Sequence, residues 1–164
     1  MTTELDIKEA EKTDVPLLPS LIKELAEAEK FPFEISVTKA DLEQNLFGEH
    51  PAAEVLVFHI GKEPAGFAIF YQTFATTTGK KGLHLDDLYV RPRFQGSGIG
   101  KKVLGHIASL ANERGCGRFE WWALEWNEKA IGFYESIGAR GMQELKIFRL
   151  QGNDIQSVSD KLDR

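Results

Sequence analysis

The segment that most constrains this chain is a glycine-rich loop that follows a strand pattern and precedes a helix pattern. Residues 83–90 read as a strand, glycines alternate with other residues over 95–100, and Ile99, Val103 and Ile107 then recur at helical spacing. Glycine lets such a loop turn tightly and lets a ligand approach its backbone. The N–H groups of a first helical turn lack helical partners, and the helix dipole adds about half a positive charge there. The segment therefore predicts a phosphate or pyrophosphate site, with a tight strand–helix turn as the alternative.

Two common phosphate-binding patterns do not fit this loop. The pattern G-x-x-x-x-G-K-[ST], aligned on Gly100, would need glycine where the chain has Gln95 and serine or threonine where it has Lys102. The dinucleotide pattern G-x-G-x-x-G would need its third glycine where the chain has Lys101. The loop is therefore neither a nucleoside triphosphate loop nor a dinucleotide fingerprint.

The rest of the chain reads as strands and helices of one α/β domain spanning residues 1–164, with a mixed, mostly antiparallel central sheet and flanking helices. The expected order is β-α-α-β-β-β-α-β-α-β, and the polar residues 151–164 read as a flexible tail. Strands are expected at about 5–7, 55–60, 65–74, 83–90, 119–124 and 142–150, and helices at about 14–29, 38–46, 98–113 and 127–137.

Charge and cysteine content narrow the classes of partner. Twenty Lys and Arg against 25 Asp and Glu give 20 − 25 = −5, which offers no electrostatic footprint for nucleic acid or anionic lipid and favours a small cationic substrate. Cys116 is the one cysteine, which excludes an intrachain disulfide and fits a reducing, cytoplasmic location. The four histidines show no metal-ligand spacing, and no apolar run is long enough to cross a membrane. We therefore expect no metal, nucleic acid or membrane partner.

Two motifs carry a resemblance to a known family. The loop matches Q/R-x-x-G-x-G/A over Gln95–Gly100, and the pattern N-x-x-A-x-x-F-Y-x-x-x-G-A occupies Asn127–Ala139. The chain thereby resembles the GNAT superfamily of acetyl-CoA-dependent N-acetyltransferases, whose fold has the element order given above. Further segments, namely 21–26, 47–51, 85–88 and 125–127, are similar to the spermidine/spermine branch, which includes diamine and thialysine enzymes.

The resemblance implies transfer of an acetyl group from acetyl-CoA to a primary amine by direct attack in a ternary complex. The acceptor would be a small cationic molecule such as a diamine, a polyamine or a thialysine-like amine. In the polyamine enzymes an aromatic residue stands where this chain has Ala28. The resemblance also implies a homodimer. The alternatives are a peptide or protein N-terminal acetyltransferase, an aminoglycoside-type acetyltransferase, and a non-catalytic CoA-binding sensor.

The reaction needs a proton acceptor and a proton donor. An alkylamine has a pKa of about 10.4, so removing its proton at neutral pH costs about 4–5 kcal/mol, and a carboxylate or an ordered water must take it. The resemblance assigns amine binding and proton relay to Asp86, and proton donation to the leaving thiolate to Tyr134. From the residues alone, a solvated strand end is an open reading of Asp86 and Asp87, and core packing is an open reading of Tyr134.

The resemblance implies further contacts to cofactor and substrate. Cofactor contacts are expected from the strand backbone at Leu88, Tyr89 and Val90, from the loop residues Gln95, Gly96, Ser97, Gly98, Ile99, Gly100 and Lys101, and from Asn127, Ala130 and Tyr134. Substrate contacts are expected from Glu29, Asp86, Asp87, Glu120, Trp121 and Trp122. Successive strand residues point to opposite faces, so only one aspartate and one tryptophan of each pair is expected to face the substrate.

Overall fold

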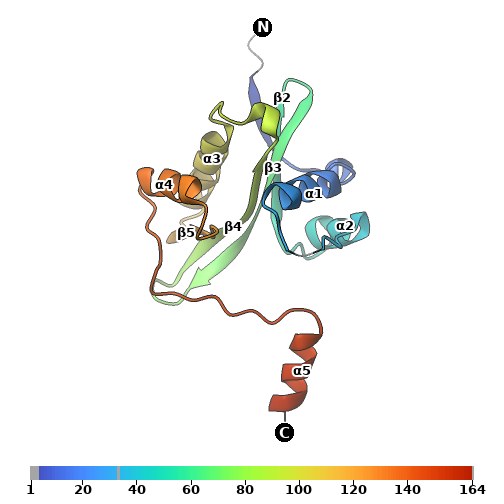
Figure 1. The fold of residues 1–164 in the computed structure, drawn as a ribbon, viewed down its shortest axis with the longest axis vertical. Helices are drawn as coiled ribbons and strands as arrows, with labels where there is room; N and C mark the ends of the chain where they lie inside the picture. The colour runs from blue at the N-terminus through green and yellow to red at the C-terminus, as the bar shows by residue number, and fades with distance from the viewer. Residues whose placement is uncertain (1–3, 33, 164) are drawn as a thin grey trace. The chain divides into compact units, whose positions relative to one another are not determined.

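The computed structural model describes residues 4–32 and 34–163, and the chain divides after Trp122 into two compact units. The first unit contains β1 (Leu5–Glu9), α1 (Leu18–Ala28), α2 (Lys39–Phe47), β2 (Glu54–Ile60), β3 (Glu63–Ala75), β4 (Lys80–Val90), α3 (Ile99–Glu113) and β5 (Arg118–Trp121). The second contains α4 (Glu128–Ser136) and α5 (Asn153–Leu162). Each unit is described by itself (Figure 1).

The sheet of the first unit has the strand order β1-β2-β3-β4-β5. The first four strands pair antiparallel, and β5 pairs parallel with β4 after the α3 crossover. The expected mixed, mostly antiparallel sheet with flanking helices is therefore confirmed. The β2–β3 hairpin is followed by the long strand β4, and the glycine-rich loop follows the end of β4.

Local sequence signals explain where the first helices begin. Thr38 and Asp41 form the predicted capping box, in which the Thr38 hydroxyl accepts from the Asp41 N–H at 3.1 Å and Asp41 accepts from the Thr38 N–H at 2.8 Å. Pro19 lies in the first turn of α1, where its missing N–H has no helical partner to lose. Each boundary therefore follows from side-chain chemistry rather than from packing alone.

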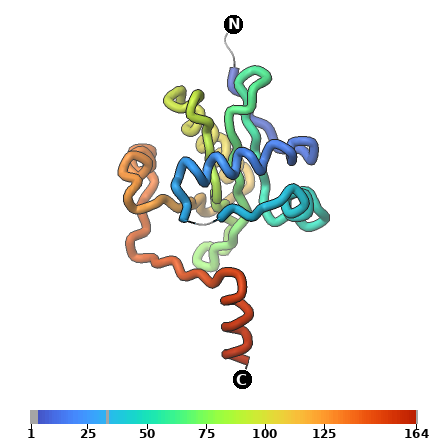
Figure 2. The backbone as a smooth tube through the Cα atoms, turned by 45° about the vertical axis from the view of Figure 1, so that its right-hand side comes forward, coloured from blue at the N-terminus to red at the C-terminus, as the bar shows by residue number. Residues whose placement is uncertain are grey.

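Helices cover both faces of the sheet. Leu21 and Leu25 of α1 belong to one buried cluster with Val57, Phe67 and Tyr89 from successive strands. Figure 1 and Figure 2 show α1 and α2 on this face and α3 on the opposite face. In the alternation of strand side chains, Phe67, Ile69 and Tyr71 of β3 therefore point toward α1, and this α1 face is the one that carries the acidic residues described below.

The strand expected at 142–150 is not formed in the part of the chain that the structure describes, and this corrects the final element of the expected order. Its apolar side chains are exposed, with Leu145 at 63% and Phe148 at 86%. Alternating apolar residues form a strand only when a neighbouring strand takes up their backbone groups, and residues 123–163 contain no other strand.

A helix, α5, lies in the segment expected as a flexible tail. Its N-cap is Gly152, at φ 56°, and Ile155, Val158 and Leu162 recur at helical spacing. That apolar spacing is visible in the sequence, but it is weak because polar residues surround it on a short segment. No helix of the described residues is long and apolar enough to traverse a lipid bilayer.

Candidate functional site

The glycine-rich loop has a backbone that L side chains rarely adopt. Gly96 lies at φ 79° and Gly98, the N-cap of α3, at φ 81°. A Cβ added at Gly96, Gly98 or Gly100 would have no atom within 4 Å, so open space lies beside all three positions. The loop therefore leaves room for a ligand directly against its backbone.

Side chains of the loop bond inward and hold its shape. The Gln95 amide donates to the Val90 carbonyl at 2.8 Å, and the Ser97 hydroxyl donates to the Phe94 carbonyl at 2.6 Å. The first α3 N–H to bond within the helix is that of Lys102, which donates to the Gly98 carbonyl at 3.1 Å. The preceding N–H groups of the first turn are free to bind an anion such as a pyrophosphate, and the exposed Lys101 adds positive charge beside them. These residues fit the diphosphate of CoA.

Beside this loop, β4 loses its partner on one edge. The β4–β5 pairing ends at Leu85 and Trp121, whereas the pairing of β4 with β3 continues to Val90. The backbone of β4 over 86–90 therefore faces β5 without a ladder in the described sheet. This is the stretch where Leu88, Tyr89 and Val90 were expected to offer main-chain groups to the thioester and its arm. The Tyr89 side chain is buried on the α1 face, so only its backbone can serve in that way.

A β-bulge separates the two aspartates of β4. Ile69 pairs with Asp87 and Phe70 pairs with Leu85, so Asp86 is the extra residue without a direct partner on β3. Strict alternation does not hold at a bulge, so the expectation that only one aspartate of the pair faces the substrate stays a prediction. Asp86 is exposed, whereas Asp87 is half-buried and pairs with a residue of the α1 face.

Three carboxylates lie close enough to interact on this face. Burial, together with the charges of Asp86 and Glu29, raises the pKa of Asp87 to about 7. Burial also raises the pKa of Glu29. A carboxyl group that titrates near neutral pH can both hold and release a proton there. Glu29, Asp86 and Asp87 are therefore close enough for their charges to interact, and the substrate contacts that the resemblance implies for them stay a prediction.

The end of α1 positions Glu29. Phe31 N–H bonds to the Ala26 carbonyl at 3.0 Å and Lys30 N–H bonds to the Glu27 carbonyl at 3.3 Å, which is the Schellman pattern of hydrogen bonds. Lys30 supplies the left-handed residue of that pattern, at φ 51°, and it is the one residue other than glycine with positive φ in the described chain. Glu29 is therefore the C-cap of a well-defined helix end, close enough to Asp87 for its charge to act on that carboxyl group.

A second polar network lies on another side of α1, and sequence reasoning missed it. Arg91 donates to both carboxylate oxygens of Glu24, at 2.8 and 3.0 Å, and the Tyr89 hydroxyl donates to the same carboxylate at 3.3 Å. Bonding to Arg91 lowers the pKa of Glu24. The network ties α1 to the end of β4, next to the glycine-rich loop. No local spacing predicts it, because its members are about 65 residues apart.

The two tryptophans lie on opposite faces of the sheet, as expected. Trp122 contacts His84 on the α1 face, with ring centroids 4.9 Å apart, whereas Trp121 pairs with Leu85 and packs against Phe119 on the other face. Glu120 pairs in register with His84, and it forms an ion pair with Arg118 at 3.3 Å. Trp122 and Glu120 therefore lie on the α1 face, which carries the acidic residues. Trp121 lies on the opposite face.

Three expected site residues belong to the second unit. The Asn127 side-chain oxygen accepts from the Ala130 N–H at 3.2 Å, so Asn127 is the N-cap of α4. Tyr134 lies two turns after Asn127, and its ring packs against Phe133 with centroids 5.6 Å apart. The capping role and a ligand role at Asn127 are compatible, because its side-chain N–H₂ group is not used by the cap.

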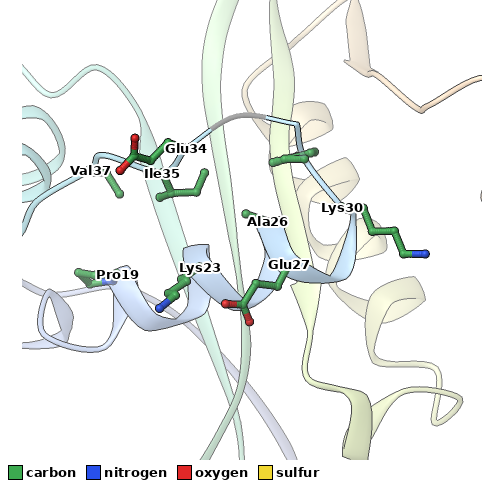
Figure 3. A pocket seen from close by; sticks show the side chains of 9 residues that line it. Pro19, Lys23, Ala26, Glu27, Lys30, Glu34, Ile35 and Val37 are labelled. Atoms are coloured by element: carbon green, nitrogen blue, oxygen red, sulfur yellow. The ribbon is translucent and has the colours of Figure 1, made fainter.

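A cavity of about 540 Å³ opens along a different side of α1. Lys23, Ala26 and Glu27 line it from the helix, and Lys30, Glu34, Ile35 and Val37 line it from the following segment (Figure 3). The cavity is lined by as many lysines as glutamates, so it has no excess of either charge. None of the predicted site residues lines it. Among the residues that the structure describes, no group of three His, Cys, Asp or Glu side chains is arranged to hold a metal ion.

Comparison with known proteins shows the family to which the chain belongs. The model of the Acetyltransferase (GNAT) family matches residues 18–139. The chain is similar to thialysine N-epsilon-acetyltransferase from Sus scrofa, at 32% identity over 94% of this chain and 97% of that protein. It is also similar to spermidine/spermine N(1)-acetyltransferase-like protein 1 from Homo sapiens, at 36% identity over 81% of this chain and 20% of that protein. Among solved structures, an integron cassette protein from V. cholerae has a TM-score of 0.78, at 26% identity over 97% of this chain and 98% of that one.

Proposed function

The chain belongs to the acetyltransferase (GNAT) family, and we propose that it moves the acetyl group of acetyl-CoA to a primary amine of a small cationic acceptor. Members of this family are acyltransferases, and they use acetyl-CoA as co-substrate. We further propose that residues 1–164 act as one catalytic domain, because the family match over residues 18–139 runs through both compact units.

The observation that carries the proposal is the half-buried carboxylate of Asp87 beside Asp86 and Glu29. Three neighbouring carboxylates create a strongly negative site, and an alkylammonium ion is the natural complement of such a site. The site lies at the start of the unpaired β4 edge, and the rest of that edge and the glycine-rich loop, which follow it along the chain, fit an acyl-CoA. An amine and a thioester would therefore be held side by side along one strand.

The proton chemistry favours Asp87 as the acceptor. A base works best when its pKa lies near the ambient pH, and the pKa of Asp87 is raised to about 7 by burial and by the charges of Asp86 and Glu29. The exposed Asp86 binds the ammonium group, as the resemblance implies, and the proton passes to Asp87 either directly or by relay through Asp86 and one water. The neutral amine then attacks the carbonyl carbon, so that a C–N bond forms and the C–S bond breaks.

The remaining roles follow the family pattern. Gln95–Lys101 and the start of α3 hold the pyrophosphate, and main-chain N–H groups over 88–90 polarise the thioester carbonyl. Tyr134 donates a proton to the leaving thiolate, and Asn127 and Ala130 contact the pantetheine arm. No protein-bound metal takes part in this scheme. A homodimer and a cytoplasmic location belong to the same proposal.

The experiment that tests the proposal measures CoA release with acetyl-CoA and a panel of acceptors. The panel contains putrescine, spermidine, thialysine, lysine, an aminoglycoside and an N-terminal peptide. We expect turnover of a small diamine or thialysine, a loss of at least about 100-fold in kcat for Asp87→Asn, and a comparable loss for Tyr134→Phe. Glu43→Gln, an exposed carboxylate of α2, is the matched control and should keep full activity.

The same panel separates the alternatives. Preference for the peptide or for the aminoglycoside would replace the proposed acceptor class while keeping the reaction. A protein that binds acetyl-CoA in calorimetry, releases no CoA with any acceptor, and binds equally well as Tyr134→Phe would be a CoA sensor, and the proposed function would be wrong.

A further inference from the structure

Two arginines lie between the end of β4 and the glycine-rich loop, and both bond to carboxylates of other elements. Arg91 donates to both carboxylate oxygens of Glu24 in α1, at 2.8 and 3.0 Å. Arg93 donates to the carboxylate of Glu63, the first residue of β3, at 2.7 Å. An arginine that binds a phosphate turns its planar fork of N–H groups toward that ligand. Here both forks bond within the protein, so the two arginines anchor the segment that leads into the loop.

The two anchors differ in how firmly they hold the chain. Arg91 also donates to the Pro64 carbonyl at 3.2 Å, and its backbone N–H donates to the Ala65 carbonyl at 2.8 Å. The Arg91 side chain is 24% exposed, whereas that of Arg93 is 64% exposed. An exposed ion pair contributes little, and a two-pronged pair that is partly shielded from water fixes geometry better. Arg91 is therefore the stronger anchor of the segment.

Arg91 holds a strand end that has a neighbour on one edge. The pairing of β4 with β3 continues to Val90, but over 86–90 β4 has no β5 partner in the described sheet. That edge leaves main-chain groups available to a ligand, and it also leaves the strand without support on that side. Tyr89 and Arg91, the neighbours of Val90 in the chain, both bond to Glu24. The helix α1 therefore supplies support that β5 does not give.

Main-chain groups assist a reaction only when they are held in place before it begins. A misplacement of about 1 Å can cost on the order of 100-fold in rate, because donors must meet the developing charge at hydrogen-bond distance. A shift of this strand end would also reach the loop, since the Gln95 amide donates to the Val90 carbonyl at 2.8 Å. The contacts of Glu24 thus bear on the stretch where we place the thioester.

We propose that Glu24 is a positioning residue for acetyl transfer, which acts through Arg91 and Tyr89 to hold the main-chain groups over 88–90. This inference rests on the proposed function, because it takes 88–90 as the stretch that meets the thioester carbonyl. Glu24 itself touches neither the acyl donor nor the amine in this scheme. Its replacement should therefore impair use of the acyl donor and leave binding of the amine unchanged.

The test compares two acyl donors, acetyl-CoA and S-acetylpantetheine, which carries the same thioester without the pyrophosphate. We expect Glu24→Gln to lower kcat/KM by about tenfold for both donors, while the KM for the amine stays at the wild-type value. A loss confined to acetyl-CoA would place the effect at the pyrophosphate loop and overturn the role at the thioester. An equal rise in the KM for the amine would also overturn it, because a general loosening of the fold would affect both substrates.

Two further variants show whether Glu24 acts through Arg91. Arg91→Lys keeps the charge but loses the planar fork, so it should reproduce the loss seen in Glu24→Gln. The double variant Glu24→Gln/Arg91→Lys should lose no more than the worse of the two single variants, and additive losses would overturn the coupling. Glu63→Gln is the matched control, because it breaks the exposed Arg93 pair in the same segment and should leave kcat/KM for both donors unchanged.

Calorimetry with acetyl-CoA separates this inference from the proposed function. Binding that weakens by about tenfold in Glu24→Gln and is unchanged in Glu63→Gln supports the positioning role whether or not an amine is acetylated. If that result is found and no amine is turned over, the positioning role stands and the proposed function fails. If amines are turned over and Glu24→Gln keeps the wild-type kcat/KM for both donors, the proposed function stands and the positioning role fails.

Discussion

Glu24 and Arg91, which are 67 positions apart, form a two-pronged ion pair that fastens α1 to the end of β4, with N–O distances of 2.8 and 3.0 Å. Arg91 also donates to the Pro64 carbonyl at 3.2 Å, so one guanidinium joins three segments of the first unit. The pair therefore links the helix that carries Glu29 to the strand that carries the aspartates and leads into the glycine-rich loop.

Replacing Glu24 by glutamine should lower the free energy of unfolding by about 1–2 kcal/mol at pH 7, because a charge-assisted pair becomes a weaker hydrogen bond. The pKa of Glu24 is lowered in the folded protein, mainly by its bond to Arg91. The stabilisation is therefore present above the unfolded pKa near 4.5 and is lost as the pH falls through the folded value. Urea unfolding at pH 7 and pH 3 should show the difference between wild type and Glu24→Gln shrinking at the lower pH.

The matched control for that experiment is Glu54→Gln, which breaks a similar pair with Arg114 at 2.7 Å away from the loop. Both variants should lose stability, but only Glu24→Gln should raise the KM for acetyl-CoA. Equal KM values in the two variants would show that the Glu24–Arg91 pair has no influence on the loop.

Alanine at Gly98 should weaken both acetyl-CoA binding and the fold. The left-handed backbone at φ 81° costs a residue with a Cβ about 1–2 kcal/mol, and the methyl group would occupy open space where we place the ligand. We expect at least a tenfold higher Kd by calorimetry. Gly105→Ala, in the middle of α3 with nothing within 4 Å of the new methyl group, should stabilise the fold by about 1 kcal/mol and leave the Kd unchanged.

Asparagine at Asp87 should stabilise the protein at high pH. The folded pKa of Asp87 is raised to about 7 from 3.8, so folding favours the neutral carboxyl group. The free energy of unfolding that the neutral carboxyl group contributes is fully present below pH 3.8 and is lost as the pH rises to about 7. The loss is about 4 kcal/mol at most. Thermal unfolding should therefore show Asp87→Asn more stable than wild type at pH 8 and similar to it at pH 4.

The exposed Asp6 of β1 provides the comparison for that measurement. Asp6→Asn should not reproduce the pH-dependent gain in stability. If Asp87→Asn were no more stable than wild type at pH 8, the carboxyl group would already be ionised at little cost, and Asp87 would be a poor candidate for the proton acceptor.

Glycine at Lys30 should raise the free energy of unfolding by about 1 kcal/mol, because Lys30 closes α1 in the left-handed conformation that glycine adopts without a steric penalty. The same replacement at Lys23, inside α1, should instead lower it by about 1 kcal/mol. Urea unfolding of both variants checks the opposite signs, and a loss of stability in Lys30→Gly would contradict the helix end described above.

The sequence could predict the parts of the site that depend on neighbouring residues. The glycine-rich loop, the capping box at Thr38 and the cap at Asn127 each have a local signal within a few positions, and all three are found in the structure. The resemblance to the family implied substrate contacts for Glu29, Asp86 and Asp87, and that role stays a prediction.

The parts that could not be predicted depend on contacts between distant segments. A β-bulge leaves no mark in the composition of a strand, so the sequence could not show that the alternation of β4 is interrupted at Asp86. The Glu24–Arg91 pair and the contact between the His84 and Trp122 rings require knowing which strands and helices are neighbours. The expected strand at 142–150 had the right alternation, but alternation cannot report whether a partner strand is available.

The bulge in β4 has a consequence for the changes that this strand can accept. It shifts the alternation of β4 by one residue, so His84 and Asp87, which are three positions apart, both lie on the α1 face. A substitution of Asp86, or even its deletion, would therefore leave every other residue of the strand on the face that it occupies now. The strand can thus vary at one inner position without disturbing the core beside it or the loop beyond it.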